Sequence, residues 1–342
     1  MRPLLSEQIL IDLLPNWIGE KFLVISPGRA QSGWHLLDKQ PQAEVQAWYC
    51  DLYEVSEAQG SASEEGYALK FQCASDLPEE TYDTVLMPVL KRGEAEFTRE
   101  LLQQAHQRLA PGGHLAVAVD NPSDTWLREQ MQVLFDKVTC IQHEQGRAYW
   151  GKKTGTLKRI RDFSCQFEFK HGEHVIKAFS RPGVFAHRKL DDGARQLLKC
   201  AEIAPTDNVL DFGCGSGGVA LGCATQTTGR VFGVDANARA VDCLRRGAEL
   251  NSLTNVQATW NANGKIGLPV AIDVALTNPP YFGNEKIWQH FADACICVMR
   301  PGGSLLVVTK QPNWFADYLD PKLDSVSVAK SGNYFIVHGW AP

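Results

Sequence analysis

The sequence carries the same pattern of apolar strands and glycine turns twice. LAPGGHLAVAV at residues 109–119 resembles MRPGGSLLVVT at 299–309, and YDTVLMPVL at 82–90 resembles IDVALTNPPY at 272–281. The interval between the paired segments is also the same in the two halves. Self-similarity of this kind indicates a duplicated structural unit, so we expect two related domains.

The second half alternates strand-type and helix-type patterns, which indicates the fold class. Apolar runs typical of strands lie at 208–212, 230–234, 271–277 and 304–309, and helical patterns lie at 236–250 and 287–298. Strands that alternate with helices form a mostly parallel sheet covered on both faces. The repeat extends this α/β fold to the first half.

The segment between the two copies predicts a hairpin. In FSCQFEFKHGEHVIKAFS at 163–180, apolar and polar residues alternate on both sides of a turn that contains glycine. This is the usual signal for two antiparallel strands. We expect the hairpin to open the second domain, with the first domain at 1–155 and the second at 156–342.

The two copies differ where chemistry would be expected. Ser26 is expected to stand where the second copy has Asp211, and PGR at 27–29 replaces its glycine-rich turn. PVL at 88–90 replaces NPP at 278–280. The first domain is therefore expected to be degenerate, that is, to keep the fold without binding the cofactor. Its expected role is substrate recognition or support of the second domain. A role in stability alone is the alternative.

The composition is typical of a folded protein with a buried core. Hydrophobic residues make up 44% of the chain, which is enough for a buried core. The ten cysteines are scattered without a CxxC pair, which favours reduced thiols in a cytoplasmic protein over a metal site or a disulfide framework. Residues 1–15 predict an amphipathic helix, and no apolar run is long enough to span a membrane.

Positive charge gathers in short clusters, although the net charge is −5. One cluster comprises Lys152, Lys153, Lys158, Arg159 and Arg161, and a second one lies at 187–189. Such clusters are either solvated faces or phosphate contacts beside a nucleic-acid site. The sequence leaves both interpretations open.

A glycine-rich turn follows the predicted strand at 208–212. Asp211 is followed by Gly213, Gly215 and Gly217, and glycines there let the backbone approach a bound ligand closely. The turn also fits GxGxxG, so a nicotinamide dehydrogenase has to be weighed. Asp211 could hold an ammonium group or an ordered water, which requires no pyrophosphate.

Polar residues that follow the next two strands are candidates for the rest of the cofactor site. Asp235 ends the strand at 230–234, where a carboxylate can accept hydrogen bonds from two ribose hydroxyls, as it does in nicotinamide enzymes too. Asn263, or alternatively Asn261, could meet an adenine edge. A turn is the competing interpretation of these asparagines.

Asn278-Pro279-Pro280-Tyr281 lies just after a strand, at the edge where open α/β sheets bind ligands. The Asn oxygen and a neighbouring carbonyl can accept both N–H bonds of a planar amine and favour a more nucleophilic nitrogen. The prolines hold that carbonyl without a competing N–H, and Tyr281 offers a stacking face to an extruded base. The motif predicts methyl transfer to a base amine held in line with a sulfonium donor, with no metal or general base required.

The order DxGxGxG, Asp, NPPY and PGG is similar to class I amino-methyltransferases. Together with PGVF at 182–185 and LDDG at 190–193, it resembles the bacterial ribosomal RNA small-subunit methyltransferase C family and its large-subunit sister family. The resemblance implies two tandem Rossmann-like class I methyltransferase domains, the N-terminal one degenerate, and S-adenosyl-L-methionine as cofactor. It implies that Phe185 and Asp191 help form the cofactor pocket. It also implies that residues 278–281 hold a guanine of ribosomal RNA or a ribosomal subunit, whose N2 amine is methylated.

Three other functions have to be weighed. NPPY would serve the amide nitrogen of a protein glutamine equally well, but such enzymes typically have a small helical domain in place of the first copy. A non-catalytic RNA-binding or assembly protein would not be expected to keep the second set of site residues intact. A dehydrogenase leaves NPPY without a role. Ligand-dependent melting separates a methyltransferase from a dehydrogenase, because S-adenosylmethionine or its demethylated product should raise the Tm by mass action, whereas NAD should not.

Overall fold

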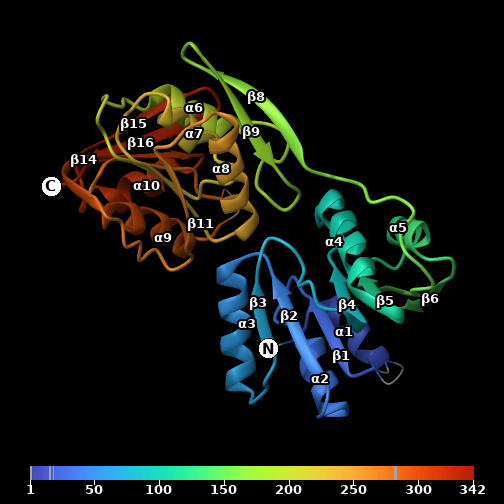
Figure 1. The fold of residues 1–342 in the computed structure, drawn as a ribbon. Coiled ribbons are helices and arrows are strands. Elements are labelled where there is room, and N and C mark those ends of the chain that lie inside the picture. Colours follow the sequence, from blue (N-terminus) through green and yellow to red (C-terminus); the bar gives the residue numbers. More distant parts are fainter. Residues whose placement is uncertain (1, 15–16, 18, 281–282) are drawn as a thin grey trace. The chain divides into compact units, whose positions relative to one another are not determined.

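The computed structural model divides the chain into two units, Met1–Phe163 and Ser164–Pro342 (Figure 1). It describes residues 2–14, 17, 19–280 and 283–342. The division falls after the expected boundary at residue 155. The reason is that the segment after residue 155 still belongs to the first unit, where the backbone of Arg161 is hydrogen-bonded to the Gln103 side chain.

The first unit is an α/β domain, as the repeat predicts. Its strands are β1 (Lys21–Ile25), β2 (Glu44–Tyr49), β3 (Lys70–Cys73), β4 (Tyr82–Val89), β5 (Leu109–Val119), β6 (Val138–His143) and β7 (Gly146–Lys152). Its helices are α1 (Leu5–Leu13), α2 (Gln31–Lys39), α3 (Leu52–Glu64), α4 (Ala95–Arg108) and α5 (Trp126–Leu134).

The second unit begins with a hairpin and continues as a second α/β domain. Its strands are β8 (Cys165–His171), β9 (His174–Ser180), β10 (Val209–Phe212), β11 (Val231–Asp235), β12 (Val256–Trp260), β13 (Ile272–Thr277), β14 (Met299–Thr309), β15 (Asp324–Ser331) and β16 (Tyr334–Trp340). Its helices are α6 (Asp192–Cys200), α7 (Gly218–Ala224), α8 (Ala238–Leu250), α9 (Glu285–Ile296) and α10 (Pro312–Leu319). The strands and helices predicted for this half are confirmed, with small shifts at their ends.

The two main sheets have the same strand order. Over the described residues the first runs β3-β2-β1-β4-β5-β7-β6 and the second runs β12-β11-β10-β13-β14-β16-β15. In each sheet the first five strands of that order pair in parallel and the last two join antiparallel. The predicted duplication of one α/β fold is confirmed.

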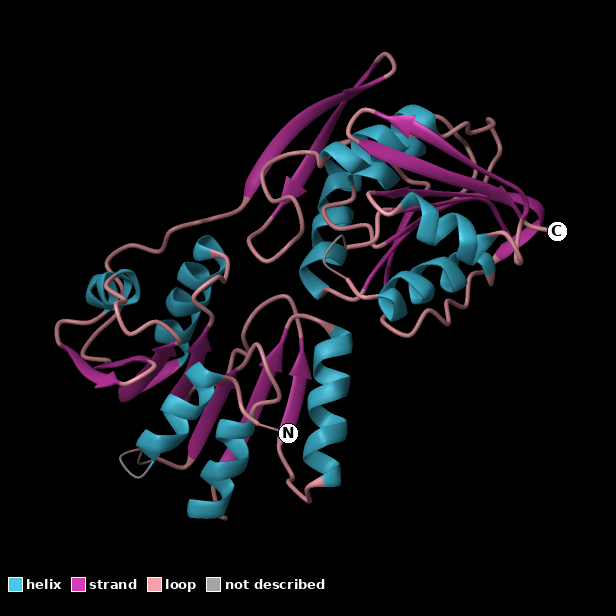
Figure 2. Cartoon of the chain, turned by 180° about the vertical axis from the view of Figure 1, so that it is seen from behind, coloured by secondary structure: helices cyan, strands magenta, loops and turns pink. Residues whose placement is uncertain are grey.

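Helices cover both faces of each sheet (Figure 2). In the first unit, α1, α2 and α3 pack on one face, and α4 and α5 pack on the other. In the second unit, α6, α7 and α8 share one face, and α9 and α10 share the other. Because both faces are covered, the central strands are apolar at almost every position, which explains the continuous apolar runs in the sequence.

The repeated Asp and PGG residues hold equivalent places in the two sheets. Asp83 accepts hydrogen bonds from the backbone N–H groups of Glu20 and Lys21, and Asp273 accepts one from the N–H of Asn208. Each carboxylate thus ties the start of the sheet's central strand to its neighbour. The second glycine of each PGG lies against backbone, since a Cβ would come within 2.8 Å of the Asp83 carbonyl oxygen at Gly113 and within 3.0 Å of the Ile272 carbonyl oxygen at Gly303.

Strand register corrects one expected correspondence between the copies. Val24 pairs with Leu86, and Asp211 pairs with Leu276. Because Leu86 and Leu276 lie equally far beyond the repeated aspartates, the counterpart of Asp211 is Val24. The expectation that Ser26 takes this place was wrong, because hydrogen bonding between strands sets the register and local similarity of the turns does not.

The predicted hairpin is confirmed as β8 and β9, which pair antiparallel from Cys165 and Ser180 to the turn at His171 and His174. It packs on α8, where the Asn251 side chain is hydrogen-bonded to the backbone of the hairpin. The amphipathic helix expected near the N-terminus is α1. Within the described residues, no helix is both long and apolar enough to cross a membrane.

Candidate active site

A pocket opens at the carboxyl ends of β10 and β13, and half of the predicted site residues line it. It is formed by the segment before α6, the glycine-rich turn and the residue after β13. Its lining comprises Phe185, Ala186, Leu190, Asp191, Ala194, Asp211, Gly213, Cys214, Gly215, Ser216, Gly218, Val219 and Asn278. The structure therefore brings Phe185 and Asp191 together with the glycine turn and Asn278, which are far apart in the sequence.

The three glycines of the turn are explained by different structural requirements. Gly213 and Gly217 have φ angles of 81° and 86°, and a Cβ would collide with Phe291 at the first and with Leu244 at the second. Gly215, with a φ of 52°, has only the backbone and Cβ of Phe185 near its own Cβ direction, at 3.7 Å and beyond. Gly215 therefore presents bare backbone to the pocket, while Gly217 supports the turn from behind and does not line the pocket.

Asp211 is a buried carboxyl at the bottom of this pocket. It is 2% exposed, and it accepts a hydrogen bond from the N–H of Ala220 in α7 at 2.9 Å. Burial, with a smaller contribution from Asp235, raises the pKa of Asp211 to about 7 against the opposing effect of the Ala220 hydrogen bond. A cation bound beside Asp211 would favour the ionised form of this carboxyl.

Asp235 ties the glycine turn to the end of β11. One carboxylate oxygen accepts a hydrogen bond from the N–H of Gly215, and the other accepts one from the N–H of Asn237, both at 2.9 Å. Asp235 is half-buried and does not line the pocket itself. Its contact with Gly215 nevertheless places it directly beside the lining.

Asn278 is held by Asp191. Its side-chain nitrogen donates a hydrogen bond to Asp191 Oδ2 at 2.9 Å, and Asp191 Oδ2 also caps α6 by accepting from the N–H of Ala194. Because a carboxylate can only accept, the contact fixes which end of the Asn278 amide is nitrogen. The amide oxygen of Asn278 is thus the atom presented for recognition of a donor group.

The two prolines follow the end of β13 at Thr277. The carbonyl of Pro280 accepts hydrogen bonds from the N–H of Gly283 at 2.9 Å and from the indole N–H of Trp288 at 3.1 Å. The Pro280 carbonyl is thus tied to α9 through Trp288. Pro279 and Pro280 do not line the pocket. The predicted stacking residue Tyr281 lies outside the described residues.

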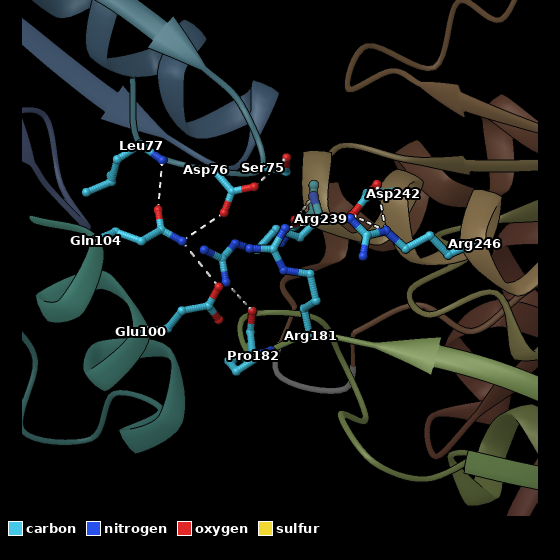
Figure 3. Close-up of polar contacts among 11 residues, drawn as sticks. Ser75, Asp76, Leu77, Glu100, Gln104, Arg181, Pro182, Arg239, Asp242 and Arg246 are labelled. Atoms are coloured by element: carbon cyan, nitrogen blue, oxygen red, sulfur yellow. Dashed lines mark hydrogen bonds and ion pairs between the residues drawn. The ribbon is translucent and has the colours of Figure 1, made fainter. Parts of the chain in front are cut away.

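The segment before α6 is anchored by residues that no sequence motif singled out. Asn237 donates to the carbonyl of Gly183 at 2.9 Å, and the fully buried guanidinium of Arg239 donates to the carbonyl of Pro182 at 2.8 Å (Figure 3). Two non-glycine residues of this segment, Ala186 and Arg188, have positive φ angles of 56° and 75°. Strained backbone held by side-chain anchors is a frequent property of ligand-binding loops. The sequence did offer a signal for the anchoring role of Arg239, because this charged residue lies on the apolar face of a predicted helix.

The segment also carries an aromatic side chain and the second basic cluster. Phe185 is 52% exposed although it lines the pocket, so its ring is available to a ligand. His187 shares a hydrogen bond with the Ser180 hydroxyl, whose oxygen also accepts from the N–H of Arg188. The side chains of Arg188 and Lys189 are exposed.

Asn263 lies in a turn after β12 and not in the pocket lining. Its side-chain oxygen accepts from the N–H of Lys265, and the oxygen of Asn261 accepts from the N–H groups of Asn263 and Gly264. Both asparagines thus shape this turn. The N–H of Asn261 also donates to the carbonyl of Asp235, which places the turn next to the end of β11.

Comparisons with known proteins support the two-domain fold. The family description "Methyltransferase small domain" matches residues 5–148 and 175–338, which covers both copies of the fold. The chain belongs to the methyltransferase small domain family. The match to the first unit identifies the first copy as a second example of the same domain, although its counterparts of the site residues differ.

Curated relatives resemble the chain over different extents. The ribosomal RNA small subunit methyltransferase C of Pseudoalteromonas atlantica is 26% identical over 333 residues, 93% of each chain. The ribosomal RNA large subunit methyltransferase G of Shewanella amazonensis is 37% identical over 145 residues, 40% of this chain and 38% of that relative.

A solved structure has the same two-domain fold. The T. thermophilus 16S rRNA N2 methyltransferase, solved in complex with AdoMet and guanosine, superposes with a TM-score of 0.79 over 98% of this chain and 92% of that one. The sequence identity is 22%, so the likeness establishes the fold. Together with the family match, it bears out the predicted tandem Rossmann-like architecture.

Proposed function

We propose that this chain transfers a methyl group from S-adenosyl-L-methionine to the exocyclic N2 amine of a guanine in ribosomal RNA of the small subunit. The methyltransferase family is established, and the relatives that align over nearly the whole chain carry the name ribosomal RNA small subunit methyltransferase C. Action on ribosomal RNA or on a ribosomal subunit would take place in the cytoplasm.

The observation that carries the proposal is the hydrogen bond between Asn278 and Asp191 at the rim of the glycine-turn pocket. It directs the Asn278 amide oxygen toward an incoming donor. We assign the second acceptor to the carbonyl of Pro279, because the Pro280 carbonyl is engaged by Gly283 and Trp288. Two acceptors match the two N–H bonds of a guanine amine, and holding them aligns the nitrogen for in-line attack.

The residues of the pocket fit the proposed cofactor. When bound, S-adenosylmethionine supplies an electrophilic methyl group on a sulfonium. Gly215 offers bare backbone and Phe185 an exposed ring to this ligand, and Asp211 offers a buried carboxyl that suits an ammonium group. We assign Asp235 to the ribose hydroxyls, since it adjoins Gly215.

Three further residues complete the proposed site. Asp191 contributes to the pocket wall and orients Asn278. Asn263 is assigned to the adenine edge, and Tyr281 to stacking on the guanine. Asn278 positions the amine and removes no proton, so the nitrogen loses its proton to water after the methyl group has been transferred.

The experiment is to compare ribosomal RNA from cells with and without this gene by mapping methylated guanines. The proposal expects one guanine N2 methyl group in small-subunit RNA to disappear with the gene and to return with the wild-type chain but not with Asn278→Ala. Unchanged ribosomal RNA, together with loss of a methylated glutamine in a protein, would contradict it in favour of protein methylation.

A further inference from the structure

A second cavity, of about 460 Å³, lies in the first unit and plays no part in the proposed methyl transfer. It is formed by α4, α5 and the segment that follows β7. Its lining comprises Arg99, Leu102, Gln103, Gln130, Val133, Leu134, Arg159, Arg161 and Phe163. We call it the arginine cavity. Among these described residues three are cationic and none carries a carboxylate.

The arginines belong to an ordered framework. Gln103 is 9% exposed; its side chain donates to the carbonyl of Arg161 and accepts from the N–H of the same residue, both at 2.8 Å. This pair of hydrogen bonds fixes the irregular segment against α4. On the other wall, Arg99 donates from Nε to the Gln130 side-chain oxygen at 2.9 Å.

Aromatic rings lie beneath two of the guanidinium groups. The guanidinium carbon of Arg161 lies 5.0 Å from the ring centre of Phe163, and that of Arg99 lies 5.4 Å from the ring centre of Trp126. Cation–π contacts keep guanidinium planes in a defined orientation. A planar guanidinium can donate two parallel hydrogen bonds to a phosphate and can also stack on a base.

The first basic cluster of the sequence divides into two parts in the structure. Lys153 donates to the carbonyls of Gln107 and Leu109, so it supports the end of α4. Arg159 and Arg161, in contrast, are exposed and line the arginine cavity. Val133, beside them on α5, is 79% exposed and adds apolar surface. The cavity thus joins phosphate-binding groups to apolar surface of the kind that a nucleobase contacts.

We propose that the arginine cavity binds a single-stranded segment of the RNA substrate, with Arg99, Arg159 and Arg161 contacting phosphates and the apolar lining contacting a base. The inference rests on the proposed function, which makes RNA the substrate. It gives the first copy of the fold a task, namely to hold RNA outside the methyl-transfer pocket. A combination of stacking surface and guanidinium groups is typical of single-strand binding sites.

The test measures binding of a fluorescent single-stranded RNA oligonucleotide to the full chain at several salt concentrations. The arginine-cavity variant is Arg159→Ala/Arg161→Ala. The control is Lys39→Ala/Arg128→Ala, which removes the same charge from exposed positions of the first unit outside the cavity. A third variant, Arg159→Lys/Arg161→Lys, keeps the charge but removes the planar groups. Thermal melting and binding of S-adenosylhomocysteine report on folding and on the second unit.

We expect the arginine-cavity variant to bind RNA about 10-fold more weakly. The magnitude of the slope of log K against log salt should fall by about 1.4, the value for two lost phosphate contacts on a single strand. The control should bind like the wild type, and the lysine variant should keep the slope with weaker binding. Equal losses of RNA affinity in the arginine-cavity variant and the control would overturn the inference. It would also be overturned if polyglutamate competed for the site as well as unlabelled RNA does. If the wild type neither binds nor methylates RNA, the proposed function itself fails.

Discussion

The two copies of the fold share a scaffold and differ in the side chains at the carboxyl end of the sheet. Helix α1 begins after Leu4, whereas α6 begins after Asp191, which caps it. Val24 takes the place of Asp211 in the central strand. Strand β4 continues through Pro88 to Val89, whereas β13 ends at Thr277 and releases Asn278 into the pocket. The scaffold has been kept while each polar site residue named here has an apolar counterpart.

In the first copy, side chains pack around the turn that corresponds to the glycine-rich turn of the second copy. The buried carboxylate of Glu7 accepts hydrogen bonds from the N–H and the hydroxyl of Ser32 at the start of α2, each at 3.0 Å. Tyr49 donates to the carbonyl of Gly28 at 2.9 Å, and a Cβ on Gly28 would meet Leu4 at 2.9 Å. Side chains of the chain itself thus occupy the surroundings that Gly215 offers to a ligand in the second copy. Cofactor binding should therefore depend on the second copy alone.

The largest effect is expected from Asn278→Ala. Loss of the amide oxygen removes one of the two acceptors that align the amine, so kcat should fall about 100-fold or more. The Kd for S-adenosylmethionine should stay within about 2-fold, because Asn278 acts on the substrate. Steady-state kinetics and calorimetry measure the two quantities. The matched change in the first copy, Pro88→Ala, should leave kcat unchanged, and full activity of Asn278→Ala would remove the assigned role.

Asp235→Ala should act on the cofactor. Loss of a carboxylate that accepts ribose hydroxyls and also holds Gly215 should raise the Kd for S-adenosylmethionine about 10-fold to 100-fold. Tyr49→Phe, at the equivalent strand end of the first copy, should leave this Kd unchanged. Isothermal calorimetry distinguishes the two, and an unchanged Kd in Asp235→Ala would contradict the ribose assignment.

The pKa of Asp211 predicts how stability depends on pH. In the unfolded chain this carboxyl ionises near its ordinary value of 3.8, whereas in the folded protein its pKa is about 7. Between these values the folded state binds more protons, so the free energy of unfolding falls as the pH rises. The Tm of the second unit without ligand should drop by roughly 5–10 °C across this window. Asp211→Asn should abolish most of this drop, and an unaltered pH profile in that variant would contradict the burial argument.

Glu7→Ala should show the smallest effect on function and a clear effect on the first unit. Ser32 would lose its buried acceptor, so the first unit should be destabilised by about 1–3 kcal/mol. The Kd for S-adenosylmethionine should not change. Denaturant unfolding and calorimetry check both statements. A changed cofactor Kd would mean that the first copy takes part in the site.

The sequence predicted the duplication and both sheets, because PGG and the aspartate that precedes it in each copy are local signals of a backbone arrangement. It also predicted six of the residues that line the pocket of the second unit. It did not predict the contact between Asp191 and Asn278, since 87 residues separate them and only the folded sheet brings them together. The same holds for Arg239 and Pro182, and for Gln103 and Arg161. The counterpart of Asp211 was misplaced because similar turns do not fix strand register.

The most direct test of the account is a crystal structure of the full chain soaked with S-adenosylhomocysteine. The account predicts one molecule per chain, lying on Gly215 between Phe185 and Asn278 in the second unit. Density on Gly28 in the first unit, or no bound molecule at a concentration that saturates the protein in solution, would contradict it.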